Sequence, residues 1–71
     1  MTMEFWRIEV VSRWIDGDWR AQQVDSVYYI NPAMIVFIRK GDLETVYALQ
    51  DGTMLRTRDS QEPTTVRFEV P

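Results

Sequence analysis

The side chains of this sequence that could do chemistry are acids, arginines and aromatic residues. The 71-residue chain has neither cysteine nor histidine, which removes thiolate metal ligands and the commonest general base. Its serines therefore lack a histidine to activate them, and no Gly-x-Ser-x-Gly nucleophile motif is present. We expect that the protein is not an enzyme and that it uses no metal and no cofactor.

The acids gather in polar turn sequences. A calcium loop needs six or more oxygen ligands, and neither Asp16 with Asp18 nor Asp59 with Glu62 reaches that number. Polar loops also offer no burial that would raise a carboxyl pKa for catalysis. We interpret these acids as hairpin-tip and loop groups that bind a partner: Asp16, Asp18, Asp51, Asp59 and Glu62.

Aromatic residues are numerous for so small a chain, at 13% of the sequence. Most can supply bulk to a small core, but tryptophan, tyrosine and arginine are also enriched at the centres of protein interfaces. We predict Trp19 and Tyr29 as interface anchors.

Basic side chains concentrate in two nearby segments. Arg39 and Lys40 end one apolar run, and Arg56 and Arg58 share one face of an alternating run. They are the alternative contact residues for a nucleic acid.

The charge balance favours a protein partner. The net charge is −3 and the isoelectric point is about 4.7, which disfavours direct binding to phosphate backbones. Such a surface suits a basic protein groove. No apolar run approaches the roughly 20 residues of a membrane span, and no signal peptide leads the chain. We expect a complete, small, acidic, cytoplasmic protein with no membrane partner.

The elements that must position these residues are strands. In "WRIEVVSRW", residues 6–14, alternation places Ile8 and Val10 on one face and Arg13 on the other. Asp16-Gly17 is a type I′ hairpin signal, and a two-residue loop pairs Trp14 with Trp19.

The remaining elements also have mainly strand signals. Residues 34–39 are almost continuously apolar, which predicts the central, most buried strand. Asp51-Gly52 predicts a second two-residue turn, with Ala48 and Leu55 on one face and Tyr47 and Met54 on the other. In residues 64–70, Val66, Phe68 and Val70 are expected to point inward. The expected strands cover 6–14, 18–24, 26–30, 34–39, 44–50, 53–58 and 64–70, with a short helix at 19–26 or 59–63 as the alternative.

Together these signals predict one domain over residues 1–71. It is mainly β, or α+β if one short helix is present. We expect a small antiparallel meander or a barrel-like sheet of about five to six strands, because turn signals recur every ten residues or so.

Residues 29–60 resemble the sheet of LytTR-type DNA-binding domains in the stretches "INPAMIVFI", "VYALQDG" and "LRTRDS". That resemblance implies a DNA-binding or transcription-regulating module that uses the four basic residues. At the level of class, an acidic, cysteine-free chain of this size without catalytic residues resembles phage-encoded inhibitors such as anti-CRISPR proteins.

The leading hypothesis is therefore a non-enzymatic inhibitor of the anti-CRISPR type. It would bind and block or modulate a larger nucleic-acid-handling protein complex, for example at a basic groove or on one subunit. The alternatives are the LytTR-like module and a homo-oligomeric structural protein, such as a homodimer, in which strand edges pair.

Overall fold

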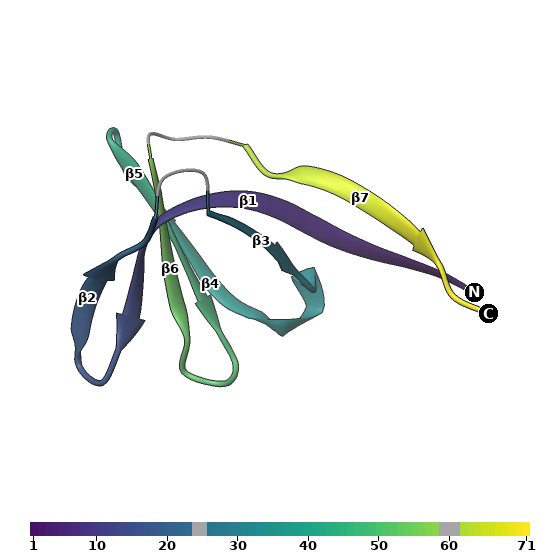
Figure 1. Ribbon diagram of the computed structural model, residues 1–71, viewed down its shortest axis with the longest axis horizontal. Coiled ribbons are helices and arrows are strands. Elements are labelled where there is room, and N and C mark those ends of the chain that lie inside the picture. Colours follow the sequence, from purple (N-terminus) through teal and green to yellow (C-terminus); the bar gives the residue numbers. More distant parts are fainter. Residues whose placement is uncertain (24–25, 59–61) are drawn as a thin grey trace.

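In the computed structural model, the chain forms one antiparallel sheet of seven strands that does not close into a barrel (Figure 1). The structure describes residues 1–23, 26–58 and 62–71. No helix in those ranges is long and apolar enough to cross a membrane. The elements are β1 (Thr2–Ile15), β2 (Asp18–Ala21), β3 (Val27–Ile30), the 3₁₀ helix η1 (Pro32–Met34), β4 (Ile35–Lys40), β5 (Glu44–Leu49), β6 (Met54–Arg58) and β7 (Thr64–Glu69).

The predicted mainly β, antiparallel fold is confirmed, and its only described helical segment is η1. The alternative helix at 19–26 is wrong where it can be tested, because β2 reaches Ala21 as a strand. Asn31 begins η1 instead, since its side chain accepts a hydrogen bond from the Ala33 amide and Pro32 fixes a helical φ at the first position. Residues 59–61 of the other alternative lie outside the described ranges.

The long strand β1 organises the sheet. Its N-terminal half lies between β3 and β7, because Trp6 pairs with Ile30 on one side and with Thr65 on the other. Its C-terminal half lies between β2 and β6, because Arg13 pairs with Arg20 and with Leu55. Beyond β6 the order continues to β5 and then β4.

The core lies on one face of this curved sheet, which we call the inner face. Its buried cluster comprises residues from four strands, with Trp6, Tyr28, Ile35 and Leu49 packed around them. The members of the cluster are Ile8, Val10, Ile30, Tyr47 and Leu55. The opposite face of the sheet is the outer face.

The β1–β2 hairpin has the predicted two-residue loop. Asp16 and Gly17 both have positive φ, 52° and 81°, as a type I′ turn requires. Trp14 consequently pairs with Trp19, and their rings meet edge to face with centroids 5.5 Å apart.

A bulge in β1 overturns the predicted face of Arg13. The register with β6 shifts between Val10 and Ser12, so the extra residue exchanges the two faces for the rest of the strand. Arg13 therefore lies opposite buried Leu55 on the inner face, whereas alternation without a bulge placed it outside. Trp14 moves to the outer face in the same step.

The β5–β6 hairpin also differs from its predicted register. Ala48 pairs with Met54 and Tyr47 with Leu55, one residue away from the expected pairs. The loop has three residues, since the Gly52 amide donates to the Leu49 carbonyl and Gly52 takes φ +89°. A type I turn followed by a left-handed glycine explains this geometry. Tyr47 is thereby turned into the core.

Two predictions of burial are wrong. The apolar run at 34–39 forms β4, which is an edge strand and largely exposed, while β5 is the buried strand because it pairs on both sides. The inward face predicted for Val66, Phe68 and Val70 is also wrong, because Val66 pairs with Phe5 and the other two follow it by alternation on the face away from Trp6. Phe68 is 45% exposed there and meets Phe5.

Candidate binding surfaces

Three of the predicted acids share one end of the sheet. Because β1 and β6 are neighbours, the tips of the β1–β2 and β5–β6 hairpins point the same way (Figure 1). Asp16, Asp18 and Asp51 are all exposed there. We call these three residues the acidic end.

Asp51 is held in its turn by a hydrogen bond. Its Oδ1 accepts a hydrogen bond of 2.8 Å from the Thr53 amide. This hydrogen bond, joined by one from the Thr53 side chain, lowers the pKa of the Asp51 carboxyl, and Arg13 adds a smaller electrostatic contribution. Asp51 therefore stays ionised to a lower pH than an ordinary aspartate does.

Glu62 does not belong to the acidic end. Its carboxylate forms an ion pair with the Lys40 ammonium, and this hydrogen bond raises the pKa of Lys40. The pair borders a hollow of about 110 Å³ that Trp6 and Tyr47 also line. Burial raises the pKa of the Tyr47 phenol there. Asp59 lies outside the described residues.

The predicted basic residues divide between the two faces. Arg39 pairs with Val46, which pairs with Arg56, so these two arginines lie on the outer face. Arg58 joins them by alternation along β6. Lys40 points to the inner face beside Glu62.

Arg56 is held by three contacts on the outer face. Its Nη2 donates to Ser12 Oγ at 3.1 Å, its Nε lies 3.3 Å from a Glu44 carboxylate oxygen, and its guanidinium stacks 4.6 Å from the Trp19 ring centre. Trp19 is half-buried between Trp14 and Arg56. Trp19 and Arg56 therefore pack against each other and cover the outer face of the sheet.

Tyr29 is the more exposed of the two predicted anchors. It is 53% exposed, and its ring meets Phe68 edge to face with centroids 6.1 Å apart. Phe5 also meets Phe68 edge to face, with centroids 5.6 Å apart. The three rings form an exposed aromatic cluster over β1, β3 and β7.

Sequence reasoning missed a run of three exposed apolar residues on β4. Val36, Phe37 and Ile38 are 61%, 51% and 46% exposed. β4 is the last strand in the sheet order, so no described strand pairs with the edge of β4 that faces away from β5. A continuous apolar run looks the same in sequence whether it is buried or covered by a partner.

The described residues contain no group of three acids that could hold a metal ion. Comparison with known proteins gave no match to a family model, a curated protein or a solved structure.

Proposed function

We propose that this protein is a small non-enzymatic binding protein that docks on a larger nucleic-acid-handling protein complex and blocks or modulates it. This is the mode of action of phage-encoded inhibitors such as anti-CRISPR proteins. It requires a docking surface rather than a catalytic site, and it takes place inside a cell, in the cytoplasm.

The β4 edge is the observation that carries the proposal. Natural edge strands are usually shielded by charged residues, proline or bulges, because their free backbone groups pair with other chains. β4 has a bulge at Val36 but presents three successive apolar side chains before its first charge at Arg39. A partner strand laid along β4 would satisfy the backbone and cover Val36, Phe37 and Ile38.

The acidic end supports a basic partner. Asp51 lies on the loop that follows β5, the neighbour of β4, and the Gln50 amide donates to the Met34 carbonyl just before β4. A partner on the β4 edge would therefore meet negative charge beside its apolar contact. Complementary charge of this kind steers association and suppresses wrong partners.

The test is a pull-down of tagged protein from nuclease-treated host lysate, read by mass spectrometry. We expect one stoichiometric nucleic-acid-handling complex, which Phe37→Glu abolishes. Leu43→Glu is the matched control, because Leu43 is 80% exposed but lies outside β4.

A second pair of variants tests the charge. Neutralising Asp16, Asp18 and Asp51 to asparagine keeps a residue that tolerates the positive φ of position 16. Neutralising Glu9, Asp42 and Glu69 removes the same charge elsewhere. The proposal is wrong if neither Phe37→Glu nor the first triple variant reduces capture relative to its control.

A direct nucleic-acid contact is the second candidate, favoured by the shared face of Arg39, Arg56 and Arg58 with Trp14 and Trp19. Since Arg56 is paired with Glu44, only two of these arginines would meet phosphates. For single strands, that predicts a slope of about −1.4 for log affinity against log salt. A gel shift with single-stranded DNA measures it; no shift at low salt excludes this candidate.

Self-association is the third candidate, favoured by the same unpaired β4 edge. Two copies would pair their β4 strands across a two-fold axis. Light scattering at two concentrations should then give twice the monomer mass, and Phe37→Glu should restore the monomer.

A further inference from the structure

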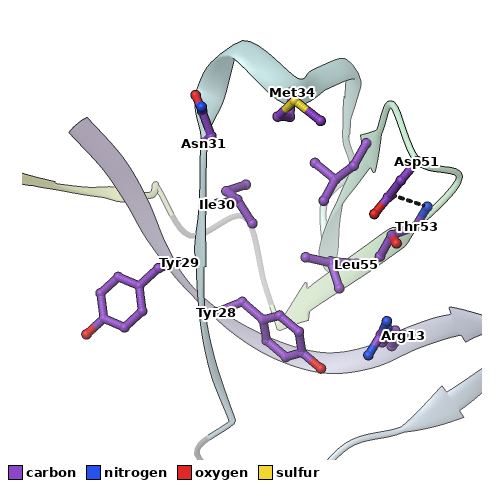
Figure 2. A pocket seen from close by; sticks show the side chains of 10 residues that line it. Arg13, Tyr28, Tyr29, Ile30, Asn31, Met34, Asp51, Thr53 and Leu55 are labelled. Carbon is purple, nitrogen blue, oxygen red and sulfur yellow. Dashed lines mark hydrogen bonds between the residues drawn. The ribbon is translucent and has the colours of Figure 1, made fainter. Parts of the chain in front are cut away.

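A pocket of about 290 Å³ opens at the inner face between β1, β3 and the β5–β6 loop. Its volume is near the lower limit for ligand pockets, which begins at about 300 Å³. Ile30, Leu49 and Leu55 give it apolar walls, and Figure 2 shows Arg13 and Asp51 on the side toward the hairpin ends. Tyr28 points into the pocket, whereas the Tyr29 ring turns away from it.

Arg13 is the unusual member of this lining. Its Nε is buried and has no hydrogen-bond partner among the described residues. A buried charged donor without an acceptor costs free energy, so such a group marks a place where an acceptor is missing. The bulge in β1 is what brings this guanidinium onto the inner face beside Leu55.

The other polar groups of the pocket have partners of their own. The Tyr28 hydroxyl donates to Gln22 Oε1 at 3.1 Å, and Asp51 accepts from the Thr53 amide. Asp51 also shows no ion pair with Arg13 among the described residues, although the two charges are close enough to interact. Since Arg13 Nε is shielded from solvent, an acceptor that enters the pocket would reach this guanidinium through its terminal nitrogens.

We propose that this pocket binds a small apolar carboxylate, whose anionic group accepts from Arg13 and whose apolar body lies against Ile30, Leu49 and Leu55. A carboxylate matches the planar guanidinium in geometry and charge. An apolar body matches the walls that Ile30, Leu49 and Leu55 form. This site is separate from the β4 edge, so it goes beyond docking on a protein.

The experiment is a titration of the ¹⁵N-labelled chain with phenylacetate, followed by two-dimensional NMR. We expect saturable shifts of the Arg13 Nε–H signal and of the Leu49 and Thr53 amides at millimolar ligand. Phenylacetamide has the same shape without the charge and should bind about tenfold more weakly, the factor expected from losing one charge-assisted hydrogen bond.

Two substitutions in the pocket should change the affinity for phenylacetate in opposite directions. Arg13→Met should weaken phenylacetate binding about tenfold. Arg20→Met is the matched control, because Arg20 pairs with Arg13 across the hairpin but lies outside the pocket and should change binding little. Asp51→Asn should strengthen it about two- to threefold by removing a like charge, since asparagine can keep the same turn.

The acid and the amide are compared on the unchanged protein, so the test survives a variant that fails to fold. Equal affinity for the two ligands would overturn the assignment of Arg13. The absence of saturable shifts would overturn the site itself. Weaker phenylacetate binding by Asp51→Asn would contradict the placement of the carboxylate.

Discussion

Replacing Arg56 by methionine separates a structural arginine from one that is free to bind phosphate. Methionine keeps an unbranched apolar stem but removes the contacts to Ser12, Glu44 and Trp19. The hydrogen bond contributes about 0.5–1.5 kcal/mol and the cation–π contact about 0.5–1 kcal/mol. The ion pair is partly exposed, at 30% and 42%, so it adds only about 0.2–1 kcal/mol.

We therefore expect Arg56→Met to lower the free energy of unfolding by about 1–3 kcal/mol. At about 4–8 °C per kcal/mol for a domain of this size, the middle of that range lowers Tm by about 8–16 °C. Urea denaturation followed by tryptophan fluorescence measures both the loss and the changed environment of Trp19. Arg58→Met is the control, because Arg58 is exposed and should cost less than about 0.5 kcal/mol.

A double-mutant cycle with Trp19→Leu isolates the stacking contact, for which we expect a coupling of about 0.5–1 kcal/mol. Equal losses for Arg56→Met and Arg58→Met, or a coupling near zero, would refute the reasoning. Arg56 would then be as free as Arg58, and the nucleic-acid candidate would gain a third phosphate contact.

Three further outcomes are expected. Gly52→Ala should cost about 1–2 kcal/mol in denaturation experiments, because the new Cβ meets no atom within 4 Å and the penalty comes only from φ +89°. Asp51 has a lowered pKa, so its stabilisation is present above the unfolded-state pKa and is lost as pH falls through the folded value, below 3.8; Asp51→Asn should remove this acid loss from a curve of stability against pH. Lys40 has a raised pKa, so its small stabilisation is present below 10.5 and is lost as pH rises through the folded value; Glu62→Gln should remove this alkaline loss in the same measurement.

Local turn chemistry was predictable where only one geometry fits it. The Asp16-Gly17 turn was right, because both positions take positive φ and the symmetric Trp-Arg flanks agree with a two-residue loop. Asp51-Gly52 carries the same dipeptide, yet Asp51 sits in a three-residue loop with only Gly52 left-handed. The dipeptide alone does not distinguish these two loops, and the difference of one residue decides whether Tyr47 or Ala48 faces the core.

Long-range arrangement was less predictable. The bulge between Val10 and Ser12 leaves no mark in an alternating pattern, so the inner position of Arg13 could not be foreseen. The strand order also decides burial, because Phe37 lies on an edge strand while Val46, less conspicuous in sequence, lies on a strand paired on both sides. The meeting of Asp16 and Asp51 at one end depends on the same order. The acids were candidates from composition, but their grouping came from β1 lying beside β6.

The position of β1 has a consequence for how the chain acquires its structure. All four strands that pair with β1 follow it in the sequence, and the pairing with β7 joins Thr2 to Glu69. Pairings between such distant residues give the fold a high contact order. Closing the long loops costs entropy before the paired strands stabilise each other, so folding should be slow. Folding should also be all-or-none, because β1 has no complete set of neighbours until β7 is present. During synthesis the side of β1 that pairs with β7 therefore stays open until residues 64–69 are available, and an unpaired strand edge of this kind makes a partly folded chain prone to aggregation.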